Sequence, residues 1–164
     1  MSRSAPAVAV LGGGPAGSAT ALALARSGVE DVVLVDATQR APAGRRGMAV
    51  GESIPPAATP LLRALGALGV VDSGGHLPCP GNRSLWGGSK VGYNDVMFDP
   101  GGKGYHLDRA LFDEQLRETA RSEGVDVLDD ARLVGVRLRE DRFELTIAGP
   151  RPTTRMSPTR KCRP

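Results

Sequence analysis

Three glycines near the start of the chain have the spacing of a phosphate-binding turn. Gly12, Gly14 and Gly17 form the pattern G-x-G-x-x-G, and Asp36 closes the next apolar run. In this pattern the first glycine permits a tight turn, the second lets the backbone approach a pyrophosphate, and the third lets a helix pack closely on a strand. An acid placed like Asp36 accepts hydrogen bonds from ribose hydroxyls and disfavours a 2′-phosphate. The sequence therefore predicts a dinucleotide site; the alternative is a glycine turn in an unrelated α/β protein.

The residues around the glycines predict the elements that hold this turn. The apolar run at residues 7–11 is typical of a short buried parallel strand, and residues 32–35 predict a second one. Pro15 suits the first turn of a helix, which residues 16–27, rich in Ala and Leu, continue until Gly28 ends it. Such a helix presents unpaired N–H groups and the positive end of its dipole to phosphates. This order of elements is a βαβ unit, for which a right-handed crossover is expected.

Further elements are predicted along the rest of the chain. Pro55 and Pro56 can begin a helix with leucines on one face, and Asp108 is a suitable N-cap for an amphipathic helix at residues 109–122. Residues 125–128 predict another parallel strand. The remaining predictions are a loop at residues 37–51, irregular chain at 72–82, short strands at 83–86 and 95–98, and an antiparallel hairpin with one wet face at 132–139 and 142–148. The fold class is α/β, with a parallel sheet and an antiparallel hairpin or meander.

Three further segments carry a resemblance to a known family. Residues 48–56 read MAVGESIPP, and this segment resembles the V-G-E-x-x-x-P segment of flavin-dependent tryptophan halogenases. Residues 82–87, NRSLWG, and residues 104–113, GYHLDRALFD, resemble a halogenase-related branch of FAD-dependent oxidoreductases. That branch includes flavoproteins that help to mature quinone-cofactor amino-acid oxidases. The resemblance runs from about residue 7 to residue 148, and it implies a Rossmann-like FAD-binding domain.

The resemblance implies a set of residues that contact FAD. By this similarity Asp36 holds the adenosine ribose, and Arg109, which opens its helix, reaches toward the cofactor with a guanidinium suited to a pyrophosphate. Glu52 has the alternative of a solvated acid leading a helix, and Arg109 that of a surface arginine. The pyrophosphate residues implied are Gly12, Gly14, Pro15, Ala16 and Gly17, and those along the flavin are Gly51, Glu52 and Ser53.

The reaction implied is a flavin-dependent oxidation of the monooxygenase or halogenase kind, in which the cofactor performs the difficult step. Halogenases of this kind use a lysine near the substrate, whereas residues 80–88 contain Arg83 and no lysine, and Trp86 is the only tryptophan, so the W-x-W-x-x-P signature is absent. We therefore assign no catalytic residue. The partners implied are a small-molecule or amino-acid-derived substrate and either NAD(P)H or a flavin reductase as the electron source. The alternatives are a nucleotide-binding remnant without activity and an NAD-binding dehydrogenase fragment.

Composition excludes several other classes of protein. The chain has 164 residues, room for one domain, and no apolar run long enough to cross a membrane. Cys79 and Cys162 form neither a metal-binding spacing nor a C-x-x-C pair, and we expect a reducing cytoplasm and no metal. His76 and His106 are isolated, which favours structural, hydrogen-bonded roles. The basic residues after Gly149 lack interleaved aromatics, so we do not expect nucleic-acid binding.

The domain organisation expected is an incomplete FAD-binding domain at residues 1–149 and a disordered basic tail at 150–164. Residues 151–164 carry three prolines among Thr, Ser and Arg, so this stretch is expected not to continue a sheet. Proteins of the resembled family continue beyond the hairpin into a substrate-binding region. Our hypothesis is an N-terminal fragment ended by a frameshift, which the other reading frames of the coding DNA after Ala148 would test.

Overall fold

The structure is a computed structural model, and it describes residues 6–37, 52–72, 75–96, 99–140, 142–149 and 154–156. The chain divides into two compact units. Unit 1 is Met1–Arg46 with Leu116–Pro164, and unit 2 is Gly47–Gln115. Helix α4 (Arg109–Ser122) contributes residues to both units. The predicted loop at residues 37–51 lies outside the described residues from residue 38 onward.

A parallel sheet with a crossover helix forms the first part of unit 1. Its strand order is β1-β2-β8, so β2 lies in the middle, and all four of its residues are buried. An unbroken Val/Leu run suits this position because a central parallel strand is covered on both faces. The predicted βαβ unit is therefore confirmed. The βαβ unit consists of β1 (Val8–Leu11), α1 (Pro15–Arg26) and β2 (Val32–Val35). Strand β8 (Asp126–Leu128) pairs with the other edge of β2.

An antiparallel meander completes unit 1 and shares its core with the parallel sheet. The strand order is β11-β10-β9, with β9 (Arg132–Leu138), β10 (Phe143–Ala148) and β11 (Thr154–Met156). Leu145 and Ile147 of β10 are buried in one cluster with Val33 and Val35 of β2. Strand β9 exposes three aliphatic side chains, those of Val134, Val136 and Leu138.

Strand β11 corrects the prediction that the chain after Gly149 cannot continue a sheet. Leu145 pairs with Met156, and Ile147 pairs with Thr154, in an antiparallel ladder. Proline removes a ladder donor only where it sits, and the three paired residues fall between Pro152 and Pro158 in the sequence. A short stretch free of proline is therefore enough to pair with β10.

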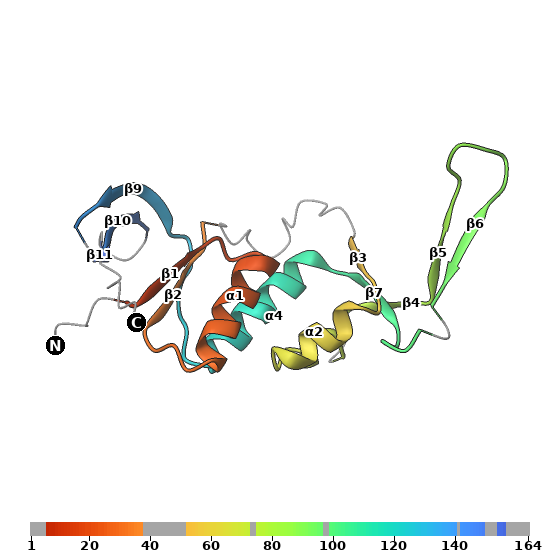
Figure 1. The fold of residues 1–164 in the computed structure, drawn as a ribbon, viewed down its shortest axis with the longest axis horizontal. Helices are drawn as coiled ribbons and strands as arrows, with labels where there is room; N and C mark the ends of the chain where they lie inside the picture. Colours follow the sequence, from red (N-terminus) through yellow and green to blue (C-terminus); the bar gives the residue numbers. More distant parts are fainter. Residues whose placement is uncertain are drawn as a thin grey trace. The chain divides into compact units, whose positions relative to one another are not determined.

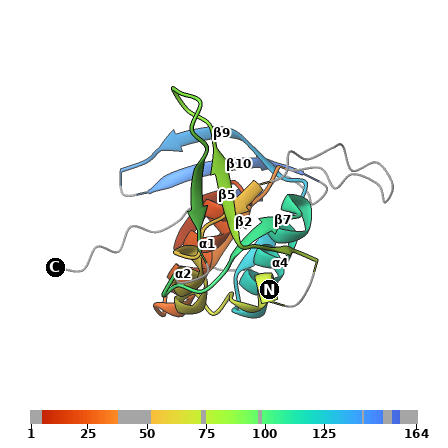
Figure 2. The same cartoon turned by 90° about the vertical axis from the view of Figure 1, so that its right-hand side faces the viewer.

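The described residues of unit 2 form two small antiparallel sheets and two short helices, in addition to the start of α4. One sheet has the order β3-β7-β4, and the other is the pair β5-β6, a ribbon that extends away from the first sheet (Figures 1 and 2). The predicted irregular stretch thus contains a strand, β4, because β7 supplies its pairing partners from far along the chain. The elements are β3 (Glu52–Ile54), α2 (Ala58–Ala64), α3 (Gly69–Asp72), β4 (Leu77–Cys79), β5 (Gly81–Ser84), β6 (Gly92–Asp95) and β7 (Gly104–Leu107).

Helix α4 has the limits that the sequence predicts. The side chain of Asp108 accepts a hydrogen bond from the Leu111 amide at 3.0 Å, which is the geometry of an N-cap. Phe112, Leu116 and Ala120 are buried on one stripe of the helix. Among the described residues no helix is long and apolar enough to cross a membrane.

Candidate functional site

The glycine turn lies at the carboxyl ends of the parallel strands of unit 1. Gly12 has a φ of +104°, a conformation that side-chain-bearing residues rarely adopt, and its amide donates to Val35 O at 2.8 Å. This bond fixes the turn after β1 beside the end of β2. Ligands of open parallel sheets bind at this edge, so the turn stands where a nucleotide site is expected.

The glycines of the turn differ in how much space surrounds them, and this shows which of them the packing of the protein requires. A Cβ at Gly17 would lie 1.8 Å from Gly12 O, and one at Gly13 would lie 2.6 Å from Asp36 Cβ. Packing within the protein therefore demands glycine at both positions. At Gly14 a Cβ would meet no heavy atom within 4 Å. The protein therefore leaves the space beside Gly14 open.

Helix α1 begins at this open space. Gly14 is its N-cap residue and Pro15 follows in the first turn, so no side chain caps the helix. The first turn contains no acidic residue. The partial positive charge at the N-terminus of α1 is thus not neutralised by a side chain of its own first turn, which suits a doubly charged phosphate group.

Asp36 follows β2 directly and is only 3% exposed. Its Oδ1 accepts a hydrogen bond from the Gly13 amide at 3.3 Å, and its Oδ2 lies 3.3 Å from Nη1 of Arg117. The carboxylate therefore anchors the glycine turn from the second strand.

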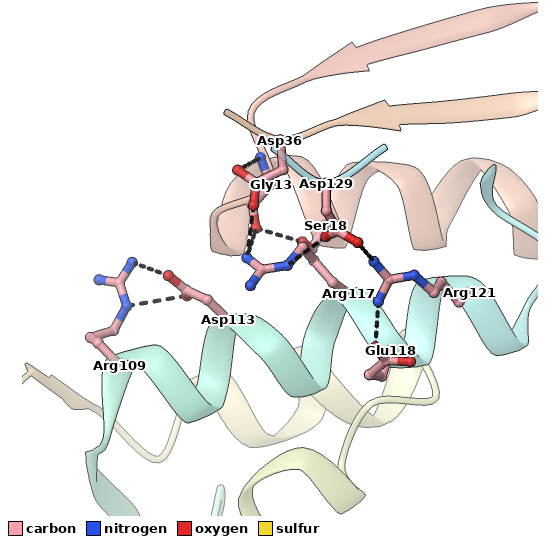
Figure 3. Close-up of polar contacts among 9 residues, drawn as sticks. All are labelled: Gly13, Ser18, Asp36, Arg109, Asp113, Arg117, Glu118, Arg121 and Asp129. Atoms are coloured by element: carbon pink, nitrogen blue, oxygen red, sulfur yellow. Dashed lines mark hydrogen bonds and ion pairs between the residues drawn. The ribbon is translucent and has the colours of Figure 1, made fainter. Parts of the chain in front are cut away.

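Arg117 is a member of this site that the sequence prediction missed. It is 7% exposed, and its Nη1 donates to Gly13 O at 3.0 Å (Figure 3). Its Nε lies 4.0 Å from Asp129 Oδ1. The available signal was helical spacing, because Arg117 falls three positions before Ala120 and adjoins the buried stripe of α4. A charged residue next to a buried stripe indicates a buried partner of opposite charge.

In unit 2 the structure brings together Glu52 and Arg109, two of the residues that the resemblance implied. Arg109 forms an ion pair with Glu52 and a two-pronged contact with Asp113, with Nε to Oδ1 at 3.2 Å and Nη2 to Oδ2 at 3.3 Å. Hydrogen bonding to Asp113, and then to Glu52, raises the pKa of Arg109 against the opposing effect of desolvation. The Arg109 guanidinium is thus held between two carboxylates.

Ser53, the next residue of β3, also has a partner on β7. Its Oγ lies 2.7 Å from Nδ1 of His106, and the two residues are register partners in the β3–β7 pair. His76, by contrast, is buried, and its Nδ1 accepts a hydrogen bond from the Asp108 amide at 3.2 Å. His76 is therefore hydrogen-bonded, as predicted, through this ring nitrogen. Gly51 lies outside the described residues, and no cluster of metal-ligating side chains occurs among those described.

Comparison with known proteins decides the family. The model of a family described as an FAD binding domain matches residues 6–153, most of the chain. The chain belongs to this FAD-binding domain family. FAD is therefore the cofactor of the domain, and the predicted resemblance to halogenases and monooxygenases is confirmed.

Two relatives and one solved structure show how far the similarity extends. The tryptophan 2-halogenase of Chondromyces crocatus is 35% identical over 124 residues, which are 74% of this chain and 22% of that protein. The flavin-dependent halogenase armH4 of Armillaria mellea is 32% identical over 136 residues, 79% of this chain and 24% of the halogenase. The myxobacterial chondrochloren halogenase CndH has the same fold, with a TM-score of 0.80 and 23% identity over 94% of this chain and 36% of that one. The FAD-binding domain thus spans about a quarter of its curated relatives.

Proposed function

We propose that this FAD-binding domain is the cofactor-holding part of a flavin-dependent oxidoreductase of the monooxygenase and halogenase kind. One observation carries the proposal: Gly14, at the uncapped N-terminus of α1, has open space where a side chain would stand. The space has no role in packing the protein, and it adjoins the positive end of a helix. We infer that an anionic cofactor occupies the space beside Gly14.

Each implied residue has a proposed part in holding the cofactor. The backbone of Gly12, Gly14 and Gly17, with Pro15 and Ala16 at the start of α1, surrounds the pyrophosphate, and Asp36 accepts hydrogen bonds from the adenosine ribose. Glu52 and Ser53 are proposed to lie along the flavin, together with Gly51, and Arg109 is proposed to reach toward the cofactor. When bound, FAD supplies electron transfer and reaction with O₂. The protein contributes binding, orientation and the exclusion of water.

The substrate and electron donor are proposed from the family. We infer a small-molecule or amino-acid-derived substrate, with electrons from NAD(P)H or from a flavin reductase. Halogenation is the less favoured reaction because residues 80–88 contain no lysine. Cys79 is a free, buried thiol, which supports a reducing cytoplasm as the compartment.

Titration with FAD tests the proposal directly. We expect the purified chain to take up FAD and Gly14→Val to bind it about tenfold more weakly or worse, because the new side chain occupies the space of the pyrophosphate. Calorimetry and flavin fluorescence are the readouts. If Gly14→Val bound FAD as tightly as the wild type, the proposal that the pyrophosphate lies beside Gly14 would be wrong.

Gly88→Val is the matched control for this titration. Gly88 also has no heavy atom within 4 Å of a built Cβ, and it lies between β5 and β6, away from the glycine turn in sequence. The substitution adds the same side chain to equally open space. We expect Gly88→Val to bind FAD like the wild type; an equal loss in both variants would contradict a specific role for Gly14.

A further inference from the structure

The carbonyl oxygen of Gly13 is held by two buried donors. Nη1 of Arg117 donates to it at 3.0 Å, and Oγ of Ser18 donates to it at 3.1 Å (Figure 3). Ser18 comes from the first turns of α1, whereas Arg117 comes from α4. Both side chains are buried, Ser18 completely. Two elements far apart in the sequence thus fix the direction of a single peptide group.

The other end of this peptide group is the amide of Gly14. The described residues contain no cis peptide bond, so the Gly13 carbonyl and the Gly14 N–H point in opposite directions across a planar group. Because the carbonyl points to Arg117 and Ser18, the N–H points away from them. Gly14 itself borders the open space that the FAD pyrophosphate is proposed to occupy.

The positive charge of Arg117 also acts through this peptide. A hydrogen bond from a charged donor is stronger than one from a neutral donor, and it polarises the peptide so that its N–H becomes a better donor in turn. Asp36 and Asp129 accompany the buried guanidinium at 3.3 Å and 4.0 Å. These carboxylates offset the cost of burying the charge.

We propose that Arg117 is a positioning residue for the pyrophosphate of FAD, acting through the Gly13–Gly14 peptide without touching the cofactor. It fixes and polarises the peptide so that the Gly14 N–H is aimed at the phosphate before FAD arrives. The inference rests on the proposed FAD site. Replacing Arg117 should therefore lower the affinity for ligands that contain a pyrophosphate. The affinity for the same nucleoside without phosphates should not change.

Binding of three probes by Arg117→Met tests the inference. The probes are FAD, ADP and adenosine, each titrated into the full chain, with NMR for the weak binding of adenosine. Methionine keeps much of the length of the side chain and removes the charge and the donors. We expect affinity for FAD and ADP to fall about tenfold and affinity for adenosine to stay unchanged. Arg117→Lys keeps the charge, and it should recover part of the loss.

Two further variants keep the test decisive if Arg117→Met folds poorly. Ser18→Ala removes the neutral donor to the same carbonyl, and it should give the same selective pattern with a smaller loss, about threefold. Arg121→Met is the matched control, because Arg121 lies one turn along α4 and pairs with Glu118 and Asp129. Arg121→Met should bind all three probes like the wild type.

The outcomes separate this inference from the proposed function. Equal weakening of FAD, ADP and adenosine in Arg117→Met and Ser18→Ala would show a general structural role and overturn the inference, as would no weakening at all. In both cases the wild type still binds FAD, and the proposed function stands. A folded wild-type chain that takes up neither FAD nor ADP overturns both.

Discussion

The guanidinium of Arg109, at the start of α4, joins Glu52 of β3 to Asp113 of its own helix. The contact with Asp113 is two-pronged, and the one with Glu52 crosses from a distant part of the sequence. Two residues selected from separate motifs therefore meet in unit 2. The neighbouring pair, Ser53 and His106, links β3 to β7 next to them.

The pair of Glu52 and Arg109 should contribute little to stability. The Glu52 side chain is 54% exposed, so water screens the attraction, and Arg109 keeps Asp113 when Glu52 is replaced. We expect Glu52→Gln to lower the unfolding free energy by less than about 1 kcal/mol in urea denaturation. A larger loss would mean that Glu52 supports unit 2 beyond its ion pair.

The pair of Asp36 and Arg117 should matter much more for stability, because both side chains are buried. Asp36→Asn leaves the Arg117 charge without its closest carboxylate, and we expect a loss of roughly 3 kcal/mol in unfolding free energy. The double variant Asp36→Asn with Arg117→Met should lose less than the sum of the two single losses. Additive losses in a urea double-mutant cycle would contradict the coupling.

Gly14 and Gly17 should respond differently to the same substitution. Gly17→Ala places a Cβ 1.8 Å from the carbonyl oxygen of Gly12, and it should destabilise the chain by about 1–3 kcal/mol or more. Gly14→Ala meets no neighbour, and the φ of −73° at Gly14 suits alanine, so its stability should stay within about 1 kcal/mol of the wild type. Thermal unfolding without FAD is the measurement. If both alanine variants lost the same stability, packing would not distinguish Gly17 from Gly14.

Tyr105 should make stability depend on pH in the alkaline range. Its hydroxyl donates to Asp72 Oδ1 at 2.5 Å, and burial, followed by this hydrogen bond and the charge of Asp72, raises the pKa of Tyr105 from 10.0 to about 12. Below pH 10 both the folded and the unfolded chain keep the phenol proton, and the stabilisation is complete. As the pH rises from 10 to about 12 the unfolded chain loses the proton first, so the unfolding free energy falls.

Tyr105→Phe isolates this contribution from that of other groups titrating in the same range. The variant should lose about 1.5–3 kcal/mol at neutral pH, because the hydrogen bond to a charged group is gone. The difference in stability between wild type and variant should then shrink as the pH rises from 10 to about 12. A difference that stays constant over this range would show that the Tyr105 proton is not bound more tightly in the folded chain.

The elements that the sequence predicted correctly are those whose signals are local. Gly12 and Pro15 mark the turn and the start of α1, and the Asp108 cap marks the start of α4. In each case the residues that produce the element are neighbours in the chain. Local chemistry therefore sufficed for the βαβ unit and for the glycine turn of the site.

The features that the sequence did not predict depend on distant partners. Strand β4 forms because β7 pairs with it, and β11 forms because β10 offers an edge. The role of Arg117 depends on Asp36 and Gly13, which α4 meets only in the folded chain. A charged residue on an amphipathic helix is usually solvated, and helical periodicity alone could not show which charge was buried.

The aliphatic row on β9 determines how the protein must be handled in solution. Val134, Val136 and Leu138 are each about half exposed or more, and exposed apolar residues on a strand favour self-association. Light scattering from concentrated samples should grow with added sulfate, since excluded salts strengthen contacts between such surfaces. Dilute conditions will suit the titrations best.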